Sequence, residues 1–454
     1  LEYDEKERLI KVTYPHNRGY ECFYDDCGRI VSRVYFDGFA QNYTYDGFGR
    51  LKSVADGEGN VFVNNAFDPV TGDLILQAYG NGTTVSNAYD ILNRIVATVH
   101  RDNKGKTIGS FRYEYNADGQ CISLATSEGA EKYEYNARGE IVGACYPDGS
   151  SERFSYDAAG NLATAENSVF MANELNQYTT IENNNRRKIL SYDPDGNLTE
   201  IAEGEDRTQC FYDPENRLVA VTNTLRGISW ACEYDALGNR IRVVNDGEVT
   251  EKIFELGHKM RVAAEYDRLG IKTRHIRLED RELAYECDGK VIYYHADGNG
   301  SIRFFTDDRG AVVATAEYKA FGTARKVTGT SCVNGFVGMF GVEQDATGFI
   351  FMRNRYYLPD IGRFVQRDPI GYMGNDVNLY RYCENDPVNK IDPDGLQSEA
   401  CKKMKKRSKP DKDPLRPILD YLRQSRDYFR RVKENINHQF DPEWMPRTAL
   451  GFQA

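Results

Sequence analysis

Hydrophobic and polar residues alternate along most of this 454-residue chain. Residues 111–115 (FRYEY) and 132–135 (KYEY) place an aromatic side chain at every second position, with charged side chains between them. A period of two with aromatic and β-branched residues is typical of a strand that buries one face. The alternation therefore predicts a mainly β protein built from short strands.

A turn motif recurs between these strands at intervals of about 21 residues. Its fullest form is YDGFGRL at residues 45–51, in which Asp bonds its own backbone and Gly takes the left-handed position. The copies begin at Tyr3-Asp4, Tyr24-Asp25, Tyr45-Asp46, Phe67-Asp68, Tyr89-Asp90, Tyr115-Asn116, Tyr135-Asn136, Tyr156-Asp157, Tyr192-Asp193, Tyr212-Asp213, Tyr234-Asp235 and Tyr266-Asp267. A fixed period indicates stacked copies of one unit.

Each repeat is interpreted as a β-hairpin, and single hairpins are unstable in water, so the copies must pair edge to edge. We therefore expect residues 1 to about 330 to form one curved antiparallel sheet with almost no helix. The tyrosines are interpreted as an aromatic ladder on the inner face, with locally bonded hydroxyls. The alternative is a stacking platform for sugars or bases.

Composition adds three expectations. No apolar stretch reaches the 18 or so residues that a membrane-spanning helix needs. The ten cysteines contain no CxxC pair, so neither a metal nor a cofactor is expected. The chain opens at Leu1 inside a repeat, which suggests a piece of a longer protein with its targeting signal elsewhere.

Charge divides the chain into two parts. Residues 397–454 hold 14 Lys/Arg and 8 Asp/Glu, a net of +6, whereas the whole chain carries −11. The first 396 residues therefore carry −17. An acidic array followed by a basic tail predicts two pieces with different roles.

The repeat period breaks near residue 290, and a series of ordered motifs follows. They are YYHADGNGS (293–301), RNRYYLP (353–359), RDPIG (367–371), NLYRY (378–382), NDPVN (385–389) and DPDGL (392–396). With the repeats, this series resembles the Rhs/YD-repeat proteins and their Rhs-associated core domain. The predicted domains are the repeat array at 1–290, the core at 291–396 and a variable tail at 397–454.

The resemblance implies a fold and a function. In that family the repeats wind into a hollow β-shell, similar to the shells of insecticidal toxin-complex C subunits and teneurins. The core closes one end and cuts its own chain after the leucine of DPxGL, and the tail, usually a toxin, stays inside. Such a protein is secreted or displayed on the cell surface. Its expected partners are its own effector, an immunity protein, and N-terminal plug or delivery domains.

Self-cleavage requires a nucleophile made reactive beside one peptide bond, which two carboxyl groups can share as base and acid. The family resemblance assigns these roles to Asp368 and Asp392, with Arg355 orienting one carboxylate and an intramolecular aspartyl protease as the activity. The bond cut would join Leu396 to Gln397. The alternative is that both Asp residues only cap turns. Two departures from the family pattern are residues 358–360 (LPD) after the tyrosines, and Asp386, a further carboxylate that could perturb the site.

Two other candidates have simpler interpretations. His295 precedes a glycine-rich stretch and no nucleophile accompanies it, so it is predicted to be a structural turn histidine. In the tail, apolar residues at three- and four-residue spacing predict a helix over about 413–437. A nuclease using His438, and binding nucleic acid through basic residues, competes there with a solvated basic helix.

A second hypothesis for the whole chain is a non-catalytic surface protein whose repeats bind carbohydrate or a partner cell. It requires outward-facing tyrosines on an open array. The carrier hypothesis requires tyrosines packed inward and the Asp pair beside residue 396.

Overall fold

The computed structural model describes residues 1–256, 260–278, 281–329 and 335–400. The chain divides into a larger compact unit, Leu1–Glu255 with Met260–Met404, and a smaller one, Leu256–Lys259 with Lys405–Ala454. Only the larger unit is described below. The predicted helix at 413–437 and His438 lie outside the described residues. Among the described residues, no helix is both long and apolar enough to cross a membrane.

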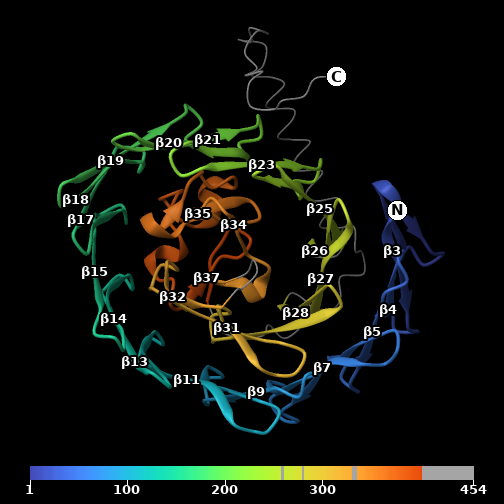
Figure 1. Cartoon of the computed structure of the whole chain (residues 1–454). Helices are drawn as coiled ribbons and strands as arrows, with labels where there is room; N and C mark the ends of the chain where they lie inside the picture. Colours follow the sequence, from blue (N-terminus) through green and yellow to red (C-terminus); the bar gives the residue numbers. More distant parts are fainter. Residues whose placement is uncertain (257–259, 279–280, 330–334, 401–454) are drawn as a thin grey trace, which may run out of the picture. The chain divides into compact units, whose positions relative to one another are not determined.

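Strands make up nearly all of the regular secondary structure of the larger unit, and turns and short 3₁₀ helices connect them (Figure 1). The main sheet holds 32 strands: β1 Glu2–Tyr3, β2 Leu9–Tyr14, β3 Arg18–Tyr24, β4 Ile30–Tyr35, β5 Ala40–Tyr45, β6 Leu51–Asp56, β7 Val61–Phe67, β8 Leu74–Tyr79, β9 Thr84–Tyr89, β10 Ile95–Arg101, β11 Thr107–Tyr115, β12 Cys121–Thr126, β13 Gly129–Tyr135, β14 Ile141–Cys145, β15 Ser151–Tyr156, β16 Leu162–Ala165, β17 Ser168–Ala172, β18 Tyr178–Asn183, β19 Arg186–Tyr192, β20 Leu198–Glu203, β21 Asp206–Tyr212, β22 Leu218–Asn223, β23 Ile228–Tyr234, β24 Arg240–Asn245, β25 Glu248–Glu255, β26 Arg261–Asp267, β27 Gly270–Leu278, β28 Arg281–Cys287, β29 Lys290–Ala296, β30 Ile302–Thr306, β31 Val312–Tyr318 and β32 Ala324–Thr328.

Short elements make up the rest. A four-stranded sheet consists of β33 Glu343–Gln344, β34 Ile350–Met352, β35 Arg355–Leu358 and β36 Arg363–Phe364, and a pair consists of β37 Lys390–Ile391 and β38 Glu399–Ala400. The helical turns are all 3₁₀: η1 Pro15–Asn17, η2 Gly338–Phe340, η3 Pro359–Ile361, η4 Gly371–Gly374 and η5 Cys383–Asn385.

Each strand of the main sheet pairs antiparallel with the next strand in sequence, from β1 to β32. Within this unit the sheet curves into a ring, and the later strands continue inside the first ones (Figure 1). The prediction of a continuous antiparallel sheet to about residue 330 is confirmed. The sheet passes residue 290 without interruption, so the boundary there stays a prediction from sequence.

The YD motif makes the same turn in copy after copy. Asp46 Oδ1 accepts the backbone N–H groups of Phe48 and Arg50, each at 2.9 Å. Its Oδ2 accepts Arg50 Nε at 2.6 Å, and Gly49 takes φ +80°. Because the side chain of Asp46 satisfies two donors that the turn leaves free, the motif ends one strand and begins the next.

The repeat tyrosines connect neighbouring repeats. Tyr45 donates its hydroxyl to the carbonyl of Ile30, 2.8 Å away, and the guanidinium of Arg29 lies 4.4 Å from its ring centroid. Equivalent hydroxyl bonds join Tyr24 to Leu9, Tyr89 to Leu74, Tyr115 to Ile95, Tyr135 to Cys121, Tyr156 to Ile141, Tyr212 to Leu198 and Tyr234 to Leu218. The hydroxyls therefore bond within the sheet, as expected of a structural ladder, and each bond reaches the preceding repeat, so the ladder links the hairpins.

The first and last parts of the sheet pack face to face. Side chains of β6, β7, β8 and β9 form one buried cluster with side chains of β27, β28 and β29. Tyr79 also donates its hydroxyl to the carbonyl of Tyr294 at 3.1 Å, and Arg33 pairs with Glu255. Apolar burial between the two layers holds the ring closed on this side.

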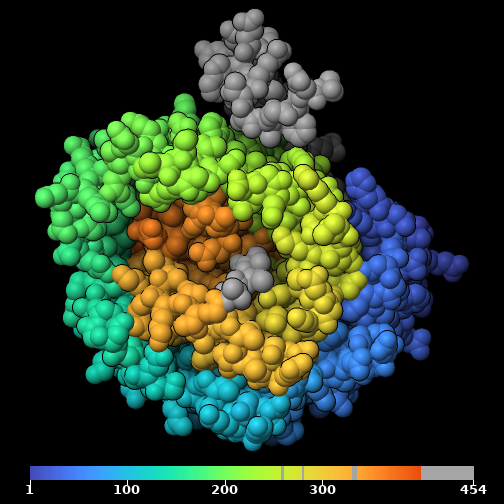
Figure 2. Space-filling view, in the orientation of Figure 1, coloured from blue at the N-terminus to red at the C-terminus, as the bar shows by residue number. Residues whose placement is uncertain are grey.

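Residues 335–400, here called the closing segment, lie within the ring (Figures 1 and 2). From Asp4 to Asp235 the YD turns follow alternate strands, so they lie along one edge of the band. The closing segment binds that edge: Asn385 Nδ2 donates to Gly160 O at 2.9 Å, and Tyr380 donates its hydroxyl to Gly196 O at 2.7 Å. The turns of the repeats therefore position the closing segment.

Candidate active site

One arginine in the closing segment lies between two carboxylates. Arg355 Nη2 is 3.0 Å from Asp368 Oδ2 and 3.2 Å from Asp392 Oδ2. The exposed fractions of the three side chains are 3%, 8% and 3% for Arg355, Asp368 and Asp392. The structure therefore brings together, out of water, the three residues that the motifs singled out.

The guanidinium of Arg355 is fixed by contacts on every side. Arg355 begins β35, its Nε donates to Gly395 O at 2.6 Å and its Nη1 donates to Leu379 O at 3.1 Å. Its guanidinium carbon lies 3.6 Å from the ring centroid of Phe364. A planar fork with three separate partners cannot rotate freely, so Arg355 holds both carboxylates in defined positions.

Asp392 also binds the peptide group of the predicted cut and the peptide group before it. Its Oδ1 accepts the N–H of Leu396 at 3.0 Å and the N–H of Gln397 at 3.2 Å. Leu396 is half-buried, and Gln397 is exposed. Asp392 therefore uses one oxygen to bind the Leu396–Gln397 segment and the other to face Arg355.

Gly395 permits this close approach. It adopts φ +65°, and a β-carbon there would stand 2.5 Å from Met352 O and 3.1 Å from Arg355 N. Only glycine fits such a position. The DPDG turn can therefore lie directly on the hairpin that carries Arg355.

Asp368 is held by the backbone around it. Its N–H donates to Leu379 O at 2.9 Å, and its Oδ1 accepts the N–H of Ile370 at 3.0 Å. Asp368 and Asp392 thus both cap turns, as the simpler hypothesis requires, but each does so with one oxygen only. The second oxygen of each carboxylate faces Arg355.

Burial governs the electrostatics of the cluster. Burial raises the pKa of Asp392 and of Asp368 above the ordinary range, although the positive charge of Arg355 acts in the opposite direction. Burial likewise lowers the pKa of Arg355, against the pull of both carboxylates. One cation faces two carboxyl groups in a buried site, so the pair binds a proton more readily than the same carboxyl groups would in water.

Two further residues, which the motif analysis did not single out, hold the loop before the predicted cut. Asn354 Nδ2 donates to Asp394 O at 2.9 Å, and Arg353 Nε is 3.4 Å from Asp394 Oδ1. Both residues belong to the same RNR motif as Arg355, so their place in this motif could have marked them as part of the site. Asp386 stands apart from the cluster in its bonds: its Oδ1 accepts Asn389 Nδ2 at 2.7 Å.

The prediction for His295 needs a correction. It is not in a turn but in β29, fully buried, with its Nδ1 3.1 Å from His100 Nδ1 and its Nε2 2.9 Å from Thr306 Oγ1. The rings of Tyr79 and Phe111 pack edge-on against this histidine pair. The two histidines join the two layers of the sheet. The run of β-branched and aromatic residues at 291–294 (VIYY) favours a strand that continues into His295, and this signal outweighed the glycines after it.

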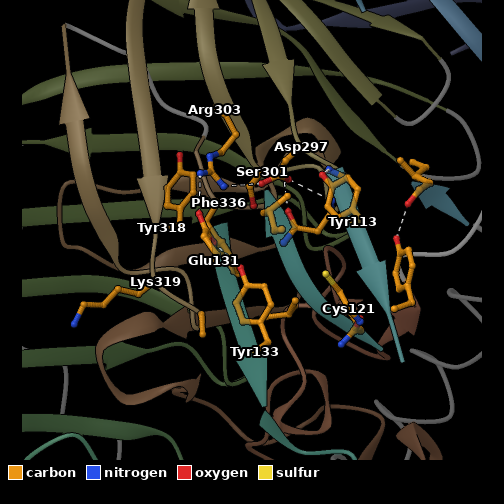
Figure 3. A pocket seen from close by; sticks show the side chains of 18 of the residues that line it. Tyr113, Cys121, Glu131, Tyr133, Asp297, Ser301, Arg303, Tyr318, Lys319 and Phe336 are labelled. Carbon is orange, nitrogen blue, oxygen red and sulfur yellow. Dashed lines mark hydrogen bonds and ion pairs between the residues drawn. The ribbon is translucent and has the colours of Figure 1, made fainter. Parts of the chain in front are cut away.

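A separate pocket lies between strands β11–β13 on one side and, on the other, strands β30 and β31 with the turn at residues 297–301 (Figure 3). Arg303 reaches into it and pairs with Asp297 at 3.0 Å and with Glu131 at 3.3 Å. Tyr133 donates its hydroxyl to Glu131 at 2.5 Å, and Tyr113 accepts the N–H of Gly298 at 2.6 Å. Arg303, Asp297 and Glu131 are thus already paired with one another, as expected of a structural contact between layers.

Comparison with known proteins agrees with this architecture. The family described as the teneurin YD-shell matches residues 70–388. The chain is 26% identical over 449 residues to the double-stranded DNA deaminase toxin A of Burkholderia cenocepacia, covering 87% of this chain and 28% of that protein. It is 28% identical over 404 residues to the tRNA nuclease WapA of Bacillus subtilis, covering 87% of this chain and 15% of that protein. The chain therefore spans less than a third of either relative.

Solved structures share the fold. The Tc holotoxin pore of Photorhabdus luminescens superimposes with a TM-score of 0.66 at 16% identity, over 87% of this chain and 22% of that chain. A crystal structure of TcdB2-TccC3 gives a TM-score of 0.66 at 17% identity, over 84% of this chain and 22% of that chain. The superpositions show that this chain and the two solved structures share the shell fold.

Proposed function

Because the chain belongs to the teneurin YD-shell family, we propose that it is the shell of a toxin carrier that cuts its own backbone between Leu396 and Gln397. The segment after Leu396 would then be a separate effector, enclosed by the shell. The observation that carries the proposal is the position of Asp392, which binds the N–H groups on both sides of that bond and faces Asp368 across Arg355.

The proposed reaction is hydrolysis of one peptide bond. The ionised carboxylate, assigned to Asp368, takes a proton from water as the water oxygen attacks the carbonyl carbon of Leu396. When the tetrahedral intermediate collapses, the carbon–nitrogen bond breaks and Asp392, whose carboxyl stands 3.2 Å from Gln397 N, gives that nitrogen a proton. The products are a carboxylate at Leu396 and an amine at Gln397.

The raised pKa values support this division of work. A site with one proton shared between two carboxyls holds both a base and an acid. Arg355 keeps one of the two ionised, because it can neutralise a single negative charge within the buried cluster. Its bond from Nε to Gly395 O also fixes the peptide group next to the cut.

The carrier role rests on the relatives and on charge. The names of two relatives describe toxic enzymes, a DNA deaminase and a tRNA nuclease, and this chain aligns with only a part of each. The net charge changes from −17 to +6 at the proposed cut, as expected if an acidic shell holds a basic cargo. We propose that the carrier is secreted or displayed on the cell surface and that a cognate immunity protein binds the effector.

The carbohydrate-binding hypothesis loses its basis in the repeats. The hydroxyl of Tyr45 is bonded to the neighbouring repeat, and Arg29 covers its ring. Tyr115, Tyr135 and Tyr156 pack against the main hydrophobic core. These side chains are therefore engaged within the sheet instead of forming an exposed stacking surface.

The test is to purify the whole chain and to analyse it by denaturing electrophoresis and intact mass. We expect two pieces, one ending at Leu396 and one beginning at Gln397. Cutting in ¹⁸O-labelled water should place one heavy oxygen in the new carboxylate of Leu396, which identifies water as the nucleophile. A folded chain that stays whole, or that is cut at another bond, would contradict the proposal.

A further inference from the structure

The chain beyond the predicted cut returns to the closing segment as a strand. β38 pairs antiparallel with β37, with Lys390 opposite Ala400 and Ile391 opposite Glu399. β37 ends immediately before Asp392, so the connection between the two strands carries both the acid and the bond that is cut. The backbone on the product side of the cut is therefore bound by the strand that leads into Asp392.

A side-chain contact reinforces this pairing. Ser398 Oγ donates to Glu384 Oε1 at 3.1 Å, and Glu384 Oε2 accepts a hydrogen bond from Lys390 Nζ. Glu384 therefore joins the residue after Gln397 to the strand on which β38 lies. Main-chain pairing and a hydrogen bond to a charged group together hold residues 398–400 in one place.

Glu384 reaches the product side from an unusual backbone conformation. Cys383, Glu384 and Asn385, which form η5, adopt φ values of +49°, +53° and +61°. Residues other than glycine rarely adopt this left-handed conformation, and three in succession persist only where surrounding contacts hold them. Asn385 Nδ2 makes such contacts, because it donates to Glu140 Oε1 at 3.0 Å and to Gly160 O at 2.9 Å. The edge of YD turns therefore anchors η5 and sets the direction of Glu384.

We propose that β37 and Glu384 form a binding site for an extended peptide, residues 398–400 on the product side of the cut, with Glu384 as a positioning residue. Strand addition binds the peptide backbone, and the carboxylate of Glu384 binds the side chain of Ser398. This site and Asp392 together hold the chain before and after the bond, so the bond is kept beside the carboxyl pair. The inference rests on the proposed self-cleavage and adds the residues that present the bond.

A double-mutant cycle tests the side-chain contact, with full chains made by cell-free translation and followed by denaturing electrophoresis. Glu384→Ala and Ser398→Ala should each be cut about fivefold more slowly, the loss expected for one hydrogen bond in a partly exposed place. The double variant should be cut no more slowly than Glu384→Ala, because both substitutions remove the same bond. A purely structural role of Glu384 would instead give effects that multiply.

Two proline variants test the strand pairing. In an antiparallel pair, residues that exchange both backbone hydrogen bonds with the residue opposite alternate with residues that exchange none. Proline lacks the N–H group, so one of Glu399→Pro and Ala400→Pro should break the ladder. That variant should be cut about a hundredfold more slowly, as displacement of a reacting group by about 1 Å commonly causes. The other proline should have a much smaller effect.

Glu166→Ala is the matched control. Glu166 also adopts a left-handed φ, +51°, and also pairs with a lysine, Lys319, at 2.7 Å. The exposed fractions of the Glu166 and Glu384 side chains are 41% and 48%. Glu166 lies between β16 and β17, and Glu166→Ala should be cut like the wild type. This variant separates the contact with Ser398 from the general loss of a left-handed glutamate and its ion pair.

Each outcome has a clear meaning. If Glu384→Ala and Ser398→Ala are cut like the wild type, or if their effects multiply, the inference is wrong while self-cleavage stands. The same holds if both proline variants are cut normally. A Glu384→Ala chain without a cooperative thermal unfolding transition would also overturn the inference, because the glutamate would then serve the fold. A wild-type chain that stays whole removes the proposed function, and the inference with it.

Discussion

The substitution Asp392→Asn tests the central assumption of the site, that Asp392 transfers a proton. Asparagine has nearly the same size and keeps a carbonyl oxygen where Oδ1 accepts the N–H groups of Leu396 and Gln397. It cannot hold or give up a proton as a carboxyl group does. The scissile segment should therefore stay in place while proton transfer to Gln397 N is lost.

The expected loss in cleavage rate follows from the contacts that the Asp392→Asn chain keeps. Arg355 still pairs with Asp368 and still donates to Gly395 O, so positioning of the peptide is largely kept. Loss of one acid–base group typically slows a reaction about a hundredfold to ten-thousandfold. This corresponds to about 3–5 kcal/mol in the activation free energy. A substitution that also removed the positioning of the peptide by Arg355 would raise the activation free energy further.

The assay follows disappearance of the full-length chain by denaturing electrophoresis after synchronised translation. Asp392→Asn should remain whole long after the wild type is cut, and Asp368→Asn should behave in the same way. If either variant is cut at the wild-type rate, the carboxyls act only as turn caps and the assignment fails. Cooperative unfolding of the uncut variants is the control for folding.

Stability distinguishes the single variants from the double variant. Burial raises the pKa of Asp392 above its value in the unfolded chain, which is about 3.9. The folded state therefore loses stability as pH rises from the unfolded pKa through the higher folded pKa. Asparagine is neutral at every pH and avoids this loss. At pH 7 the single variants should therefore remain stable. The double variant, Asp368→Asn with Asp392→Asn, leaves the buried Arg355 without either carboxylate. Its free energy of unfolding should be about 3–5 kcal/mol lower than that of the single variants. Urea denaturation of the three uncut chains measures this difference.

Three further predictions concern the cluster and the shell. Arg355→Lys loses the planar fork and should slow cutting about a hundredfold, measured by the same electrophoresis. Asp46→Ala removes three hydrogen bonds from one turn and should cost about 1–2 kcal/mol in urea denaturation, whereas exposed Phe48→Ala should cost under about 0.5 kcal/mol. Burial lowers the pKa of His100 to about 3 and also that of His295. The free energy of unfolding should therefore fall below pH 6.5, by about 1.4 kcal/mol per pH unit for each of the two histidines. His100→Gln should flatten this pH dependence between pH 7 and 5, measured by urea denaturation.

Much of the fold was predictable because its interactions are local in sequence. The bonds of Asp46 to Phe48 and Arg50 lie within one turn, so a repeated motif was sufficient to predict repeated hairpins. Pairing of each strand with the next is likewise a short-range contact. The hydroxyl bond of Tyr45 spans 15 residues, so the turn motif alone could not identify Ile30 as its partner.

The site was predictable only through ordered motifs. The positions Arg355, Asp368 and Asp392 came from their place in a family pattern, since an Asp-Pro dipeptide alone predicts no more than a turn.

The sequence by itself determined the hairpin unit, its repetition and the order of the closing motifs, because alternation and turn chemistry act over a few residues. The tertiary structure decided which distant segments meet: the packing of β6–β9 on β27–β29, the pairing of His100 with His295, and the attachment of the closing segment along the edge of YD turns. These contacts depend on how the small twist of each strand pair accumulates over the whole sheet. No short stretch of sequence encodes that sum, so the meeting of Arg355, Asp368 and Asp392 at Leu396 becomes visible only in the folded chain.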